Sequence, residues 1–204
     1  GKTTLVNYME SLGIPVFIAD EEAKKAMQSP QVLDNVKANF GNAIFENGHL
    51  NRQQLASIVF SNPDKLKELN SIIHPEVKRQ FAIWLDQHKT VPFVVYEAAI
   101  LFESGSYQNC DYIITVTVPL EDRITRVMQR DNCSREEVLQ RINAQWTDVE
   151  RAAKSNFVID NTKFKVLNKF TYEDNIHSVV ESVIDCYKNR NPKVVIRNEY
   201  FQYD

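Results

Sequence analysis

The sequence has few cysteines, no long apolar run and little net charge, and each shortage excludes a class of protein. Its three cysteines (Cys110, Cys133 and Cys186) are odd in number and far apart, which argues against a disulfide framework or a zinc site and favours a reducing cytoplasm. No apolar run approaches membrane-spanning length, and no signal peptide is visible. A formal charge of −3 gives no overall attraction to nucleic acid or anionic membranes. We therefore expect a cytoplasmic protein with no nucleic-acid or membrane partner, and we expect a monomer or a weak homo-oligomer.

The first residues carry a phosphate-binding motif. Gly1-Lys2-Thr3-Thr4 matches the second half of the loop G-x-x-x-x-G-K-[ST], and an amphipathic helical pattern follows it. In that motif backbone N–H groups surround a polyphosphate, the lysine reaches its outer phosphates, and the Ser/Thr hydroxyl binds Mg²⁺. The sequence starts inside the motif, and in folds that carry this motif the strand before the loop lies in the middle of the sheet, where its loss would leave ladder groups unpaired on two neighbouring strands. We therefore expect a further strand and a Gly-rich loop upstream.

Short apolar segments that alternate with helical patterns predict one α/β domain with an inserted helical lobe. The segments predicted as strands are residues 15–18, 91–96, 112–116 and 156–161. Asp20 follows the first of them, at the edge where open α/β sheets bind their ligands. The alternative for Asp20 is a helix N-cap, and the two roles are compatible. Glu97 follows the second strand, which we predict to be buried on both faces, and is predicted to help hold Mg²⁺ through water.

Residues 29 to about 88 are predicted to form four helices without a strand between them. Ser29-Pro30, Asn51 and Asn62-Pro63 open three of them, and His74-Pro75 is expected to break the chain before the fourth. Asn47-Gly48 is a predicted turn. Such an insertion usually carries specificity for a second substrate, and the alternative is a helical cap without a ligand.

Arginines are concentrated after the third predicted strand. Arg123, Arg126 and Arg130 lie on one side of a predicted helix over 120–129, and Arg141 lies in the next helix, which begins with the capping-box sequence 134–137. Arginines at this spacing form either a solvated helix face or a lid that supplies cations to a transferring phosphoryl group.

Together these landmarks resemble the dephospho-coenzyme A kinase family over residues 1 to about 188. The similar segments are Gly1-Lys2-Thr3-Thr4, residues 12–16, Ala19-Asp20, residues 50–52, Ile73-His74-Pro75, Leu101-Phe102-Glu103, residues 126–131, residues 134–137, Gln145 and residues 158–161. Two positions depart from the family pattern. Ile18 stands where the family often has an aspartate, so Asp20 is the only acidic group left at that strand end. Glu97 stands where the family usually has the shorter aspartate.

The resemblance implies a three-layer P-loop kinase fold: a five-stranded parallel sheet flanked by helices, a helical acceptor lobe and a helical lid. It implies a single domain over 1–190, with a core of 1–28, 91–119 and 152–190, the acceptor lobe over 29–90 and the lid over 120–151. Residues 191–204 form a tail without a predicted role. The implied activity is phosphorylation of the ribose 3′-hydroxyl of dephospho-CoA by ATP with Mg²⁺, the last step of coenzyme A synthesis. The alternatives are another small-molecule or nucleoside monophosphate kinase, and a nucleotide-binding module without turnover.

The resemblance also assigns roles to individual residues. Lys2, Asp20 and Arg130 are the expected catalytic residues, with Asp20 as general base or orienting group for the acceptor hydroxyl. The residues expected to bind ATP are Gly1, Lys2, Thr3, Thr4, Arg126, Arg141 and Asn161. The residues expected to line the acceptor site are Asp20, His74, Phe102 and Glu103. Thr3 and Glu97 are the expected contacts of Mg²⁺.

Overall fold

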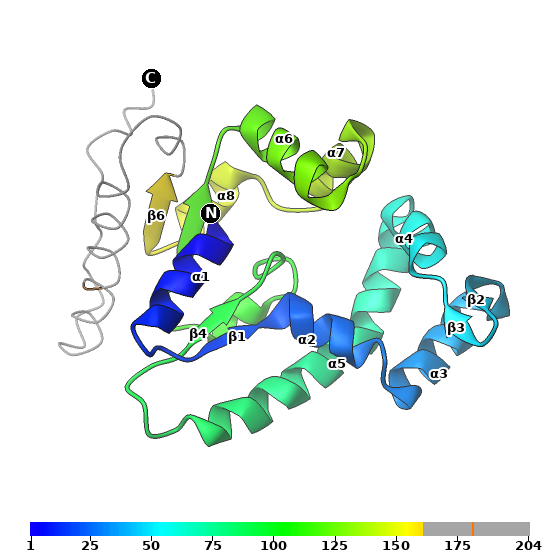
Figure 1. The fold of residues 1–204 in the computed structure, drawn as a ribbon, viewed down its shortest axis with the longest axis horizontal. Coiled ribbons are helices and arrows are strands. Elements are labelled where there is room, and N and C mark those ends of the chain that lie inside the picture. Colours follow the sequence, from blue (N-terminus) through cyan, green and yellow to red (C-terminus); the bar gives the residue numbers. More distant parts are fainter. Residues whose placement is uncertain (161–180, 182–204) are drawn as a thin grey trace.

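The computed structural model describes residues 1–160 together with Glu181, so the predictions for Asn161 and for the tail lie outside the described residues (Figure 1). The helices are α1 (Lys2–Ser11), α2 (Ala19–Ala26), α3 (Pro30–Phe40), α4 (Arg52–Phe60), α5 (Pro63–Gln87), α6 (Leu120–Asp131), α7 (Arg135–Asn143) and α8 (Asp148–Lys154), with short 3₁₀ turns η1 (Asn42–Ile44) and η2 (Ser106–Asn109). The strands are β1 (Val16–Ile18), β2 (Phe45–Glu46), β3 (His49–Leu50), β4 (Val95–Glu97), β5 (Ile114–Thr117) and β6 (Phe157–Asp160).

The described residues contain two separate two-stranded parallel sheets. Strands β1 and β4 pair with Ile18 opposite Glu97, and β5 and β6 pair from residue 114 opposite residue 157 onward. Leu5 and Met9 of α1 form a buried cluster with Ile159 of β6, and apolar residues of all four strands complete or flank this cluster. The predicted α/β class and the parallel pairing are therefore confirmed.

The second strand differs from its prediction in two ways. It covers Val95–Glu97 rather than residues 91–96, so Glu97 is its last residue instead of the residue that follows it. Its residues are only half-buried, although a buried strand was predicted. The physical reason is that, within residues 1–160, β4 pairs with β1 alone. Its second edge therefore has no paired strand in the described part of the chain.

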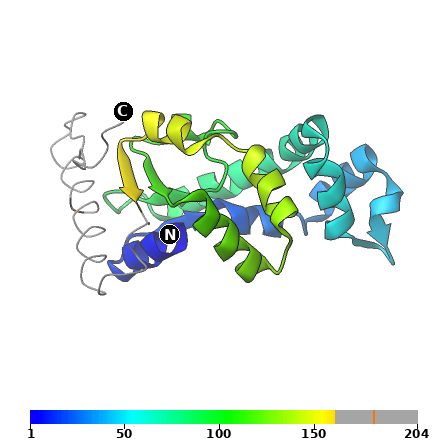
Figure 2. The ribbon, with the colours of Figure 1, turned by 90° about the horizontal axis from the view of Figure 1, so that it is seen from above.

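The predicted helix starts between residues 29 and 63 are confirmed by their caps. The side chains of Ser29, Asn51 and Asn62 each accept hydrogen bonds from backbone N–H groups of the following first turn. The Asn47-Gly48 turn is also confirmed, with φ angles of 50° and 80°. This turn joins β2 and β3 into a small antiparallel hairpin, which corrects the prediction of a region without strands. In Figures 1 and 2 the hairpin lies with α3 and α4 at one end of the molecule.

The predicted break at His74-Pro75 is wrong, because Pro75 lies inside α5, a continuous helix of 25 residues. Proline removes one helical hydrogen bond and its ring crowds the carbonyl of Ser71, at a cost of about 3 kcal/mol. Leu69 and Ile73 before the proline and Val77 after it are all buried in one core cluster with residues of α2, α3 and α4. Each such burial stabilises the helix by about 1.5–3 kcal/mol, so together the three outweigh the cost of the proline.

The helices after β5 begin at capping boxes. The predicted box at Ser134 is confirmed, since Ser134 and Glu137 each bond the other's backbone N–H. Thr147 and Glu150 form a second box at the start of α8, a helix that was not predicted although Thr-x-x-Glu is the same signal. In the described part of the chain, no helix is both long enough and apolar enough to cross a membrane.

Replacing the internal proline of α5 should stabilise the protein. We expect Pro75→Ala to raise the free energy of unfolding by about 1–3 kcal/mol, because alanine restores the missing N–H donor and removes the ring. The measurement is equilibrium urea unfolding followed by circular dichroism. Pro63→Ala is the matched control, because Pro63 occupies the first turn of the same helix, where proline fits. The control should leave stability unchanged or lower it by less than about 1 kcal/mol. A less stable Pro75→Ala protein would contradict this interpretation.

Candidate active site

An ion pair joins the first residue of α1 to the last residue of β4. The Lys2 Nζ lies 2.6 Å from Glu97 Oε1, and the Glu97 side chain is only 16 % exposed. Burial of Leu5 and Met9 against the strands holds α1 in the orientation that brings its start to this strand end. The ion pair is therefore partly shielded from water, where opposite charges attract more strongly than on an open surface.

Asp20 lies at the same edge of the sheet. It is the second residue of α2 and is solvent-exposed, and the N-cap of that helix is Ile18 without a side-chain hydrogen bond. The alternative that Asp20 caps α2 is therefore wrong. Partial desolvation raises the pKa of Asp20 and the charge of Glu97 raises it further, while Lys2 and a hydrogen bond from the Ala99 backbone N–H oppose this rise. Lys2, Asp20 and Glu97 thus form one electrostatically coupled cluster.

The start of α1 presents free donors beside this cluster. Gly1 is its N-cap and makes no side-chain capping bond, the first turn has no acidic residue, and Thr3 and Thr4 are exposed. A helix start of this kind attracts anions through its backbone N–H groups and its dipole. The charges of Arg126, Lys2 and Arg130 act at the position of Gly1, so these cations face the helix start.

The arginines of α6 and α7 have different surroundings. Arg130 and Arg141 both pair with Asp131, at 2.7 and 2.9 Å, and hydrogen bonds from Arg130 and then Arg141 lower the pKa of Asp131. Arg141 also lies 6.0 Å from the centre of the Phe60 ring in α4. Arg126 forms no ion pair within residues 1–160. Arg123, which the sequence grouped with these residues, pairs with Asp148 and donates to the Val118 carbonyl.

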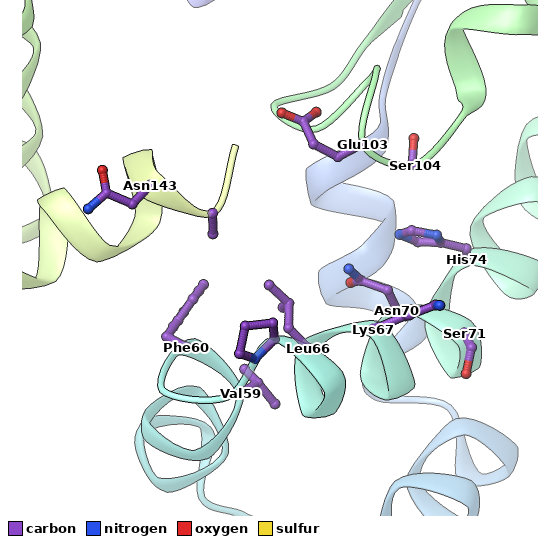
Figure 3. A pocket seen from close by; sticks show the side chains of 12 residues that line it. Val59, Phe60, Leu66, Lys67, Asn70, Ser71, His74, Glu103, Ser104 and Asn143 are labelled. Atoms are coloured by element: carbon purple, nitrogen blue, oxygen red, sulfur yellow. The ribbon is translucent and has the colours of Figure 1, made fainter. Parts of the chain in front are cut away.

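A cavity of about 580 Å³ lies between the helical region, the loop after β4 and the end of α7 (Figure 3). Its lining residues are Val59, Phe60, Pro63, Leu66, Lys67, Asn70, Ser71, His74, Glu103, Ser104, Asn143 and Ala144. Two of the predicted acceptor residues, His74 and Glu103, therefore line one cavity. Burial lowers the pKa of His74, so its imidazole is neutral at pH 7 and can both donate and accept a hydrogen bond.

Phe102 and Asp20 lie outside that lining. The Phe102 side chain is 5 % exposed and stacks on Trp146, with ring centroids 5.2 Å apart. Lys67, Asn70 and Ser71 were not predicted as site residues, although with His74 they share one face of a helix at spacings of three, four and seven. All four residues lie in the helix predicted to begin at Asn62-Pro63, so the shared face was visible in the sequence, but the loop and the end of α7 that complete the cavity were not.

The cluster also offers oxygen ligands that suit a hard divalent cation. Within the described residues, no three His, Cys, Asp or Glu side chains are grouped so as to hold a metal ion. The Thr3 hydroxyl and the Glu97 carboxylate are nevertheless of the chemical type that Mg²⁺ prefers. Magnesium in phosphoryl-transfer sites is usually held by one or two protein ligands, water and the substrate phosphates. The residues present therefore fit an ion that arrives with a nucleotide.

A helix start with an adjacent lysine attracts phosphate groups, and an α/β fold with such a start beside acidic strand ends is typical of kinases, a class of phosphotransferase. Comparison with known proteins gives the family. A profile of the dephospho-CoA kinase family matches residues 1–165, and the chain belongs to this family. The dephospho-CoA kinase of Bacteroides fragilis (strain YCH46) is 37% identical over 168 residues, covering 82% of each chain. That of Fusobacterium nucleatum is 35% identical over 176 residues, covering 83% of this chain and 91% of the relative.

Solved structures agree with this assignment. The crystal structure of a Thermus thermophilus protein superposes with a TM-score of 0.76 at 32% identity, covering 91% of each chain. The dephospho-CoA kinase from Campylobacter jejuni superposes with a TM-score of 0.60 at 26% identity, covering 89% of this chain and 90% of its own. The similarity therefore extends over most of the fold.

The coupling within the cluster is directly testable. We expect Glu97→Gln to lower the pKa of Asp20, because it removes a neighbouring negative charge, and Lys2→Met to raise it, because it removes a positive one. The measurement is an NMR titration of ¹³C-labelled aspartate carboxyls. Lys24→Met is the matched control and should raise the pKa of Asp20 less than Lys2→Met does, because Lys24 is the weakest of the identified influences. Equal effects of the two lysine substitutions would contradict the proximity of Lys2 and Asp20.

Proposed function

We propose that the chain transfers the γ-phosphoryl group of ATP to the ribose 3′-hydroxyl of dephospho-CoA, giving coenzyme A and ADP in the last step of coenzyme A synthesis. Membership of the dephospho-CoA kinase family supports the activity and both substrates. The observation that carries the proposed mechanism is that Lys2 and Asp20 meet at one strand edge, closely enough for the lysine to influence the pKa of Asp20. Phosphoryl transfer requires the donor phosphate and the acceptor hydroxyl to be held close together, and a lysine and an aspartate at one strand edge would hold one each.

The start of α1 is the proposed binding site for the nucleotide phosphates. Lys2, the backbone N–H groups of the first turn, and Gly1 and Thr4 would surround the β- and γ-phosphates. The polyphosphate would replace Glu97 as the ionic partner of Lys2. Magnesium, when bound, neutralises charge that develops on the phosphoryl oxygens, and Thr3 and Glu97 are the residues that would hold it.

Asp20 is the proposed general base. Its carboxylate would accept the proton of the 3′-hydroxyl as the oxygen attacks, and its raised pKa makes it a better proton acceptor than an ordinary aspartate. The cavity beside α5 is the proposed site for the rest of the acceptor, with His74 and Glu103 on its wall. Its apolar and polar lining suits a long substrate with both kinds of group. Phe102 lies outside the cavity and stabilises the loop after β4 by stacking on Trp146.

The finer architecture is part of the proposal. A fifth strand between the β1–β4 and β5–β6 pairs would complete a five-stranded sheet, and the shared contacts of both pairs with α1 support that arrangement. Helices α6 and α7 would act as a lid that brings Arg130, Arg126 and Arg141 to the transferring phosphoryl group. The charges of Arg126 and Arg130 act at the start of α1, which supports the first two assignments. Arg141 lies over the Phe60 ring and pairs with Asp131, so it would have to break the ion pair with Asp131 to reach the phosphoryl group.

The strongest alternative is a kinase of the same class with another small acceptor. An acceptor screen separates the two, because the shape of the lobe and the contacts in the cavity decide specificity within this class. We expect ADP release in a coupled assay with dephospho-CoA, and at least about 10²-fold lower kcat/KM with AMP, CMP or shikimate. A higher kcat/KM with any of these acceptors would overturn the proposed substrate.

Asp20→Asn should abolish most of the turnover without loss of nucleotide binding. We expect kcat to fall about 10²–10⁴-fold, because the amide cannot accept the proton, while the Kd for ATP from calorimetry stays within about twofold. The folded state raises the pKa of Asp20, so its ionised form destabilises the fold at pH values above that pKa. The variant should therefore be at least as stable as the parent protein at pH 7, which excludes unfolding as the cause.

Asp34→Asn, on the exposed surface of α3, is the matched control for that substitution and should leave kcat unchanged. An undiminished kcat in Asp20→Asn would remove Asp20 from the mechanism.

A further inference from the structure

Glu103 links the loop after β4 to the segment between α7 and α8. Its Oε1 accepts a hydrogen bond of 2.6 Å from the Trp146 backbone N–H. The Trp146 ring stacks nearly parallel on Phe102, at an interplanar angle of 14°. Two consecutive loop residues therefore hold the chain just beyond α7, one through a charged hydrogen bond and the other through an aromatic stack.

Arg151 of α8 completes this link. Its Nη2 donates to Gln145 Oε1 at 3.0 Å and lies 3.7 Å from Glu103 Oε1. The two charged side chains are only 18 % and 17 % exposed. Glu103 Oε2 and Arg151 Nε are both buried and have no hydrogen-bond partner among the described residues. Leaving such groups unpaired costs free energy, so a buried pair of this kind calls for a reason beyond stability.

The position of the link beside the cavity supplies that reason. Glu103 and Ser104 line one wall, and Asn143 and Ala144, at the end of α7, line another. Figure 3 shows Glu103 on its loop across the cavity from the helix that carries Asn143. Trp146 follows Asn143 by three residues, so the contacts of Glu103 with Trp146 and Arg151 fix the separation of these two walls. We call these two contacts the Glu103 anchor.

We propose that Arg151 is a positioning residue for the acceptor substrate. It acts through Glu103 and Gln145, holds the end of α7 against the loop after β4, and so keeps the cavity at the width that the acceptor requires. This inference rests on the proposed function, because it takes the cavity to be the dephospho-CoA site. The start of α1 does not belong to the anchor, so binding of ATP should not depend on Arg151.

The first test compares KM for the two substrates in Arg151→Met and Arg151→Lys. We expect the methionine variant to raise KM for dephospho-CoA at least about tenfold and KM for ATP less than about twofold. The lysine variant, which keeps the charge, should give an intermediate KM for dephospho-CoA. Arg79→Met is the matched control, because Arg79 also pairs with a glutamate but lies on the exposed face of α5. An equal rise of both KM values, or no change in KM for dephospho-CoA, would overturn the inference.

The second test asks whether Arg151 acts through Glu103. In a Glu103→Ala background, Arg151→Met should change KM for dephospho-CoA by less than about twofold more, because the alanine substitution already removes the contacts of Glu103 with Trp146 and Arg151. If the two substitutions instead raised KM for dephospho-CoA by independent factors that multiply in the double variant, the inference would be overturned and Arg151 would have a merely structural role.

A spectroscopic readout separates failure of the anchor from failure of the proposed function. The sequence contains two tryptophans, so in a Trp84→Phe background the emission reports on Trp146 alone. Arg151→Met should shift that emission to longer wavelength in the absence of substrates, because Trp146 leaves the Phe102 stack. An unchanged spectrum would overturn the anchor. A parent protein with no turnover of dephospho-CoA would instead overturn the proposed function and the acceptor role of Arg151, even if the spectral shift is found.

Discussion

The ion pair between Lys2 and Glu97 is the interaction on which the chemistry of the site depends. It links the first turn of α1 to the end of β4 and sets the charge around Asp20. With the pair intact, the lysine charge is already compensated and the helix start is available to a further anion. A nucleotide would exchange one anion for another on Lys2 and leave the carboxylate of Glu97 free for a cation. A polyphosphate carries more negative charge than the single carboxylate it would replace, so a divalent cation held by Glu97 would have to compensate the remainder.

The continuity of α5 connects this cluster to the cavity. The same helix carries Lys67 and His74 at the cavity wall and Phe81 in the core below. The Phe81 ring packs edge-on against Phe17 of β1 and Tyr96 of β4, with centroids 5.0 and 4.9 Å away. One rigid element thus joins the cavity wall to the two strands that end beside Asp20. Two helices separated at Pro75 would have placed a hinge between the cavity and the strand ends.

Local signals predicted much of this structure, and tertiary contacts account for most of the errors. The cap at Ser29 and the Asn47-Gly48 turn depend on a few adjacent residues, and both are confirmed. The break at Pro75 was wrong because the decisive term, burial of apolar side chains on both sides of the proline, involves helices distant in the sequence. Arg151 was missed for the same reason, since its buried partner Glu103 lies 48 positions earlier. The convergence of Lys2 with Glu97 likewise needs the folded chain, although the strand-end rule indicated each carboxylate separately.

The arginines of α6 and α7 differ in how firmly their present contacts hold them, and therefore in how easily they could bind another anion. Arg123 is 21 % exposed and has two acceptors, Asp148 and the Val118 carbonyl, so withdrawing it would break its contacts with two partly buried groups. Arg130 is 72 % exposed and pairs with its own neighbour, Asp131. An exposed pair of this kind contributes about 0–1 kcal/mol, so a phosphoryl group with more than one negative charge would readily displace it. Arg126, which has no ionic partner within residues 1–160, requires no exchange at all. In the proposed mechanism, the cost of releasing each arginine, rather than its position in the sequence, would therefore order them as ligands for a transferring phosphoryl group, with Arg126 and Arg130 ahead of Arg123.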